Sequence, residues 1–180
     1  MERVEALRQA LPDAARDIKL NLQAVLSSAA PLADDQRWGI ALASALAARN
    51  PRLTAAVQAD AAAKVRPEML EDARAAAALM AMNNVFYRFR HLVERPAYTQ
   101  RPARLRMNRL AQPLSSKLDL ELFSLAVSAI NGCGSCIQAH EQVVREGGLS
   151  EDQVHETIRI AATIQACAVA LEISDAQRSP

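Results

Sequence analysis

The sequence predicts an all-α fold, a compact helical domain, on two observations. Hydrophobic residues make up 51% of the 180 residues and aromatic residues only 3%, and alanine and leucine supply most of the apolar content. Small and unbranched side chains favour closely packed helices, whereas strands are enriched in β-branched and aromatic residues. No segment shows the alternation of apolar and polar residues that a half-buried strand requires. We therefore expect one domain over residues 1–180.

The charge balance and the first residues argue against several classes of protein. With 21 basic and 20 acidic residues the formal net charge is +1, so no overall field favours nucleic acid or a membrane surface. No stretch of about 18 uninterrupted apolar residues is present. The opening residues MERVEALRQALPDAARDIKL lack the apolar core of an export signal. These features predict a cytoplasmic protein without nucleic-acid or membrane partners.

Four helices are expected in the first part of the chain, over residues 13–28 and 34–49 and from Pro51 and Pro67 onward. The first follows Pro12, with Asp13 placed to cap it. The second opens with acidic residues, which suit the positive end of a helix dipole. Proline is favoured in the first helical turn, where its missing N–H would have no intrahelical partner.

The main break in the helical pattern covers residues 95–113, RPAYTQRPARLRMNRLAQP, which contain three prolines. Ser150 and Gln153 match a capping box, in which each of two side chains accepts a hydrogen bond from the other residue's backbone N–H. Three helices are expected after the break: over residues 116–131, from near 133 to Gly147 and Gly148, and from Ser150 onward.

A faint internal repeat predicts two related halves, about residues 1–95 and 114–180. A shift of 84 residues aligns 44–58 with 128–142 without a gap, and SALAARNPRLTAAVQ then faces SAINGCGSCIQAHEQ. Identities are few and several are alanines, but the order of helix, short helix and long helix recurs. Only the second half carries cysteine and histidine at the aligned positions.

The segment NGCGSCIQAHE at residues 131–141 is the strongest chemical signal. Two residues separate Cys133 from Cys136, and His140 follows Cys136 by four. If a helix starts at or just before Cys133, with Asn131 as its cap, the three side chains share one face. The helix dipole favours a thiolate, and an imidazole one turn away can take the thiol proton. A second thiol can then attack the oxidised sulfur and close a disulfide.

These arguments leave open which cysteine reacts first. The dipole favours Cys133, which is nearer the helix start and, by the usual pattern, more exposed. The imidazole favours Cys136. Glu121 lies twelve residues before Cys133 on the preceding helix. A carboxylate there can orient His140 and share its proton, and the alternative is a solvated surface glutamate.

A zinc site is the main alternative for the cysteines. A structural zinc normally has four ligands, and the sequence has no second Cys-x-x-Cys. His91 and His155 lie in differently patterned helices and are expected at the surface or in packing. A thioredoxin-type pair would follow a strand, and none is expected. Cys167 lies in an apolar helical run and is expected to be a small buried hydrophobe.

Glu121, the run Cys133-Gly-Ser-Cys136 and His140, with MNNVFYRFRHL at 82–92, resemble the alkyl hydroperoxidase D (AhpD) family. That family belongs to the carboxymuconolactone decarboxylase-like superfamily, and the similarity runs along most of the chain. It implies an all-helical homotrimer of two-halved subunits that reduces organic hydroperoxides. It also implies recycling by dihydrolipoyl groups on the lipoylated E2 subunit of a 2-oxo acid dehydrogenase, and reduction of the peroxiredoxin AhpC.

Carried onto this chain, the resemblance implies that Cys136 is the peroxidatic cysteine, which becomes a sulfenic acid. Cys133 would be the proton donor and resolving partner in a Cys133–Cys136 disulfide, and Glu121 and His140 would form a proton relay. No metal or tightly bound cofactor is implied, and dihydrolipoamide would be the reductant. Some members have a histidine just before the second cysteine, where this chain has Ser135, whose hydroxyl can hold a bridging water.

Residues 88–109 form an arginine-rich segment with one acidic residue, Glu94. It is interpreted as a solvated or subunit-facing surface, with docking of an acidic lipoyl domain or of nucleic acid as alternatives. The arginines are Arg88, Arg90, Arg95, Arg101, Arg104, Arg106 and Arg109.

Two alternative functions remain open. One is a disulfide reductase acting on a partner protein, with little peroxidase activity, and the other is a non-redox decarboxylase-like enzyme.

Overall fold

The computed structural model describes residues 1–27 and 31–178, and within them the chain is all-α with no strand. The elements before the break are α1 (Glu2–Gln9), a 3₁₀ turn η1 (Asp13–Ala15), α2 (Arg16–Ser27), α3 (Asp34–Ala48), α4 (Pro51–Ala62) and α5 (Pro67–Val93). Those that follow are α6 (Pro96–Thr99), α7 (Asn108–Ala111), α8 (Lys117–Ile130), α9 (Gly134–Glu146) and α10 (Glu151–Arg178). The predicted fold class is confirmed.

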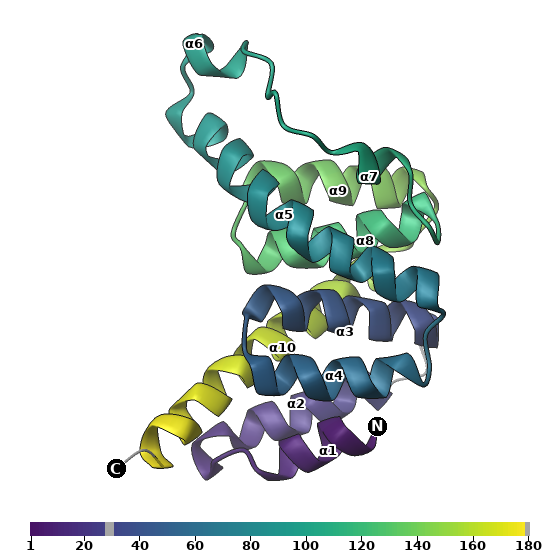
Figure 1. The fold of residues 1–180 in the computed structure, drawn as a ribbon, viewed down its shortest axis with the longest axis vertical. Coiled ribbons are helices and arrows are strands. Elements are labelled where there is room, and N and C mark those ends of the chain that lie inside the picture. Colours follow the sequence, from purple (N-terminus) through teal and green to yellow (C-terminus); the bar gives the residue numbers. More distant parts are fainter. Residues whose placement is uncertain (28–30, 179–180) are drawn as a thin grey trace.

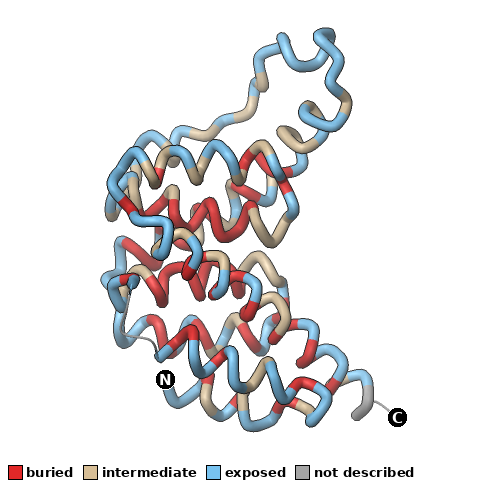
Figure 2. The backbone as a smooth tube through the Cα atoms, turned by 180° about the vertical axis from the view of Figure 1, so that it is seen from behind, coloured by how far each residue is buried: buried red, intermediate tan, exposed pale blue. Residues whose placement is uncertain are grey.

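Helix α8 lies at the centre of the fold and packs against α3, α5, α9 and α10 (Figure 1). Almost all of its side chains from Asp119 to Ser128 are buried, with Glu121 the half-buried exception. Figure 2 shows that burial is concentrated in this stack of helices, while the chain around α6 projects into solvent. The fold therefore holds α8, and with it Glu121, on a rigid support.

The close approach of α3 to α8 depends on Gly39. A Cβ atom at this position would lie 2.4 Å from Cζ of Phe123, a side chain that is itself fully buried. Interiors are close-packed, so the ring has little room to move away. Only glycine at position 39 lets the two helices meet at this distance.

Most of the expected elements are confirmed. Pro51 and Pro67 begin α4 and α5, and the break holds only the single turns α6 and α7. The capping box forms, because the Gln153 N–H donates to Ser150 Oγ at 3.2 Å and the Ser150 N–H donates to Gln153 Oε1 at 2.8 Å.

The cap expected of Asp13 is wrong: the chain first makes η1 and Asp13 makes no capping bond. Residue 28, the expected end of that helix, lies outside the described residues, and α1 was not anticipated.

Two series of helices follow one another with similar lengths. Helices α3, α4 and α5 have 15, 12 and 27 residues, and α8, α9 and α10 have 14, 13 and 28. This order agrees with the alignment of the two halves, although common descent of the halves remains a prediction.

Helix α10 is long and apolar enough to cross a membrane by length and composition alone, because an 18-residue window within Glu151–Ala176 has a mean hydropathy of 1.3. Of that window, 56% is buried inside the protein. A core helix passes the same test, and α10 packs on α2, α3 and α8. The expectation of no membrane partner remains a prediction.

Replacing Gly39 by alanine should lower the free energy of unfolding by about 1–3 kcal/mol, the usual range for overpacking a core. The new methyl group would collide with the Phe123 ring. Urea denaturation followed by circular dichroism measures the change. Gly134→Ala is the control, because its Cβ would meet nothing within 4 Å. Equal losses in the two variants would contradict the packing argument.

Candidate active site

The cysteine pair stands where the chain turns from α8 into α9. Cys133 and Cys136 form a disulfide with a Cα–Cα distance of 5.3 Å, so the predicted pairing is confirmed. The expected cap is wrong: Cys133 itself is the N-cap of α9, and Asn131 ends α8 instead. Gly132 has a φ of +67°, a left-handed conformation that glycine adopts without strain, and this allows the tight turn.

Cys136, not Cys133, faces the accessible side of the motif. Cys133 is fully buried and Cys136 is 7% exposed, so the greater exposure expected of Cys133 is wrong. A cavity of about 360 Å³ opens beside Cys136 between α5, α7 and α9. Its walls are mostly apolar, which suits a small molecule with an apolar body. The lining residues are Met80, Asn83, Tyr87, Met107, Leu110, Ser135, Cys136, Ala139 and His140.

His140 is held from two sides. Its Nδ1 lies 2.6 Å from Oε2 of Glu121 on α8, and its Nε2 lies 3.2 Å from the sulfur of Met80 on α5. The imidazole and the carboxylate are each only 12–13% exposed. Glu121 is therefore not the solvated surface glutamate of the alternative interpretation. The ring nitrogens face these two partners, so a proton passing to Cys136 has to travel through a water or after a rotation of the ring.

Both ring nitrogens of His140 have a partner. The Nδ1 contact with Glu121 is a hydrogen bond whose donor depends on the tautomer of the imidazole. The Nε2 atom faces a thioether sulfur, which is a weak acceptor. A carboxylate beside an imidazole can orient the ring and share its proton, here in a site of low solvent access.

A small polar network fixes the turn that carries Cys133. The Asn84 amide donates to Ser128 Oγ at 2.9 Å and accepts from the Asn131 amide at 2.9 Å. The Arg88 guanidinium donates to the backbone carbonyl of Asn131. Asn84 and Ser128 are buried, so these bonds exclude water and tie the α8–α9 turn to α5.

Sequence reasoning missed Met80 and Asn84. Both lie in or next to MNNVFYRFRHL, where the spacing of polar residues along one long helix gives no sign of what they will contact.

Ser135 lines the cavity, and its hydroxyl oxygen lies 3.6 Å from the Cys133 sulfur. This hydroxyl can hold a water in the cavity.

The third cysteine, the other two histidines and the exposed arginines do not line the cavity. Cys167 is fully buried, as expected, and His91 and His155 are exposed. Of the seven arginines, Arg109 pairs with buried Asp72, while Arg101 and Arg104 are exposed beyond α6. Within residues 1–27 and 31–178 no group of three His, Cys, Asp or Glu residues has metal-binding geometry. The absence of a metal remains a prediction.

Comparison with known proteins agrees with the geometry. The model of the "Carboxymuconolactone decarboxylase family" matches residues 96–176, which include the disulfide and His140. The "Alkyl hydroperoxide reductase AhpD" of Anaeromyxobacter dehalogenans (strain 2CP-C) is 62% identical over 180 residues, covering 100% of this chain and 96% of the relative. The protein of the same name from Methylobacterium sp. (strain 4-46) is 50% identical over 169 residues, covering 94% of this chain and 96% of the relative.

The fold and the disulfide-forming site thus define a member of the carboxymuconolactone decarboxylase-like superfamily. Within that superfamily, the identity along the whole chain shows that the protein belongs to the AhpD family.

Cys167 should resist thiol reagents in the native, reduced protein. Burial raises the pKa of its thiol to about 12, so at pH 8 only about one molecule in ten thousand carries the thiolate that reacts. The folded state favours the protonated form, and this preference persists until the pH approaches the raised pKa. Iodoacetamide labelling between pH 7 and pH 10, read by mass spectrometry, should leave Cys167 unmodified, whereas urea-unfolded protein labels there. Rapid labelling of Cys167 in the native protein at pH 8 would contradict the raised pKa of this thiol.

Proposed function

We propose that the protein is an alkyl hydroperoxide reductase that acts as an antioxidant enzyme. The observation that carries the proposal is the Cys133–Cys136 disulfide beside an apolar cavity, next to the Glu121–His140 pair. The names of the relatives, alkyl hydroperoxide reductases, support the same activity. No metal or tightly bound cofactor takes part.

In the first step Cys136 is the peroxidatic residue. Its thiol gives a proton to the His140–Glu121 relay, and the thiolate attacks the terminal oxygen of the hydroperoxide. The O–O bond breaks, the alkoxide takes a proton and leaves as the alcohol, and Cys136 is oxidised to a sulfenic acid. The position of Cys136 on the cavity wall supports this role.

In the second step Cys133 resolves the sulfenic acid. Its thiol gives up a proton, its sulfur attacks the Cys136 sulfur, and the departing hydroxide takes the proton and leaves as water. An external dithiol then reduces the disulfide and is itself oxidised to a disulfide. The burial of Cys133 supports the assignment, because a resolving thiol needs to reach Cys136 and not the solvent.

The proposed reductant and partners are those that the resemblance to the AhpD family implies. Dihydrolipoyl groups on the E2 subunit of a 2-oxo acid dehydrogenase reduce the disulfide, and the enzyme in turn reduces the peroxiredoxin AhpC. A flexible lipoyl arm, which is largely apolar, suits an apolar cavity. The cytoplasm, where thiols are kept reduced, is the compartment in which such a cycle can run.

The assembly is a homotrimer in this proposal. Large apolar side chains are exposed on the C-terminal part of α5, on α6 and on α10, and a single chain leaves them in water. Exposed apolar surface of this kind is typical of interfaces. The residues are Val85, Phe89, Leu92, Tyr98, Val169 and Ile173.

A partner-protein disulfide reductase would use the same residues, and comparing peroxide consumption with and without the peroxiredoxin separates the two functions. A non-redox decarboxylase-like enzyme would not need the cysteine pair. Full activity in a Cys136→Ser variant would favour that function instead.

Stopped-flow mixing of reduced protein with cumene hydroperoxide should oxidise Cys136 first. In Cys133→Ser, mass spectrometry should find a sulfenic acid at Cys136, trapped by dimedone, because the resolving thiol is missing. Cys136→Ser should lower the rate by about a thousandfold or more, and His140→Gln by about a hundredfold. His155→Gln, at an exposed position, is the control and should react normally. First oxidation at Cys133 would overturn the assignment.

Charge reversal at Arg101 and Arg104 should slow turnover with a protein-bound lipoyl group. Both side chains are exposed on the segment that leads into the cavity wall at Met107, and steering by rim charges changes association rates by about tenfold. Turnover with free dihydrolipoamide should change by less than about twofold, because an uncharged small molecule is not steered by these arginines. Reversal of Arg16 and Arg66, on other faces, is the control. Equal slowing with both reductants would count against docking.

A further inference from the structure

One wall of the catalytic cavity comes from a segment with little regular structure. Residues Met107–Ser115, here termed the strap, contain the single turn α7 and lead from the projecting segment into α8 (Figure 1). Met107 and Leu110 face the cavity from the strap, while Cys136 and His140 face it from α9. A segment without a helix ladder needs another source of order if it is to keep this wall in place.

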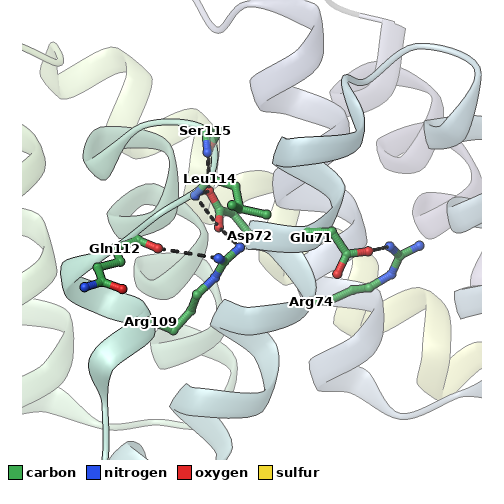
Figure 3. A network of polar contacts seen from close by, with 7 residues as sticks. All are labelled: Glu71, Asp72, Arg74, Arg109, Gln112, Leu114 and Ser115. Atoms are coloured by element: carbon green, nitrogen blue, oxygen red, sulfur yellow. Dashed lines mark hydrogen bonds and ion pairs between the residues drawn. The ribbon is translucent and has the colours of Figure 1, made fainter.

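That source is Asp72 on α5. Its carboxylate is fully buried and accepts hydrogen bonds from the backbone N–H groups of Leu114 and Ser115, at 2.9 and 2.7 Å, and from the Ser115 hydroxyl at 2.7 Å. The Arg109 guanidinium donates to it at 2.7 Å, and to the Gln112 carbonyl at 3.4 Å. Figure 3 shows these bonds converging on one side chain.

Breaking the hydrogen bonds of Asp72 would leave a buried carboxylate unsatisfied, which is unfavourable in free energy. A buried carboxylate is stable only when its oxygens are satisfied, and here each oxygen accepts more than one donor. The two backbone N–H groups in turn have no helical partner and depend on Asp72. The next residue, Ser116, caps α8 by accepting from the Asp119 N–H, so the strap is anchored at the end that leads into α8.

We propose that Asp72, acting with Arg109, holds the strap closed against the cavity and thereby determines the preference for hydroperoxides with a large apolar body. The inference rests on the proposed function. With the wall in place, an apolar substrate buries its body against Met107 and Leu110, whereas hydrogen peroxide has no such body to bury. Loosening the strap removes contacts that only the larger substrate makes. Asp72 is a positioning residue, since it touches the strap and not the substrate.

The test compares cumene hydroperoxide with hydrogen peroxide in the full-length protein, with dihydrolipoamide as reductant. Asp72→Asn should lower kcat/KM for cumene hydroperoxide by about tenfold, through KM, because losing contact with about two methylene-sized groups has that effect. For hydrogen peroxide kcat/KM should change by less than about twofold. Glu71→Gln is the matched control, since Glu71 pairs with Arg74 on the exposed face of the same helix (Figure 3) and should leave both values unchanged.

Further variants protect the test from a simple loss of folding. Arg109→Gln removes one donor to Asp72 and should shift the ratio of the two kcat/KM values in the same direction, while Arg109→Lys should restore part of it. Leu110→Ala shortens the wall directly and should reproduce the selectivity change with the strap still pinned. Equal losses for both substrates in Asp72→Asn and Arg109→Gln would overturn the inference. Failure of the wild-type protein to reduce either peroxide would overturn the proposed function instead.

Discussion

The contact between His140 and Glu121 is the interaction on which the proposed chemistry depends, and the short turn between α8 and α9 makes it inevitable. Two antiparallel helices joined by three residues have to pack side by side, so a carboxylate near the start of α8 meets a histidine in the middle of α9. Because α8 packs against α3, α5 and α10 as well as α9, the backbone that carries the carboxylate is fixed relative to α9. The position of the imidazole is thus set by the fold and not by the site alone.

Helix α5 plays an equivalent part from the other side. Met80 contacts the imidazole, Asn84 ties down the turn before Cys133, and Asp72 binds the strap. These residues all lie on one helix, so the same element positions the imidazole ring, the turn that carries the disulfide and the wall of the cavity. Catalytic groups held by rigid elements need less reorganisation during a reaction than groups held by loops.

The sequence predicts the helices and the chemical cluster well, because both depend on local spacing. Proline at a first turn, the capping pair Ser150 and Gln153, and the four-residue separation of Cys136 and His140 are local signals. The contacts of Met80 and Asp72 are not, because their partners lie tens of residues away and nothing in the pattern of α5 marks which positions face the site. The cap assigned to Asn131 failed for a related reason: its amide bonds to Asn84 on another helix instead of to the backbone of α9.

The first half of the chain has the same order of helix lengths but neither cysteine nor histidine at the aligned positions. Under the 84-residue alignment Cys133 corresponds to Arg49, Cys136 to Arg52 and His140 to Ala56. Arg49 ends α3 in a left-handed conformation, Asn50 caps α4 by accepting from the Leu53 N–H at 3.0 Å, and Arg52 pairs with Asp175. Helix α1 packs over α4 on this side. In the second half the equivalent turn carries a disulfide, and the strap stands off α9 far enough to leave a cavity. A cavity also lies beside Arg52 and Ala56, between α1 and α4. The difference between the two halves therefore lies in the side chains at the aligned positions, and not in whether a cavity lies beside the short helix.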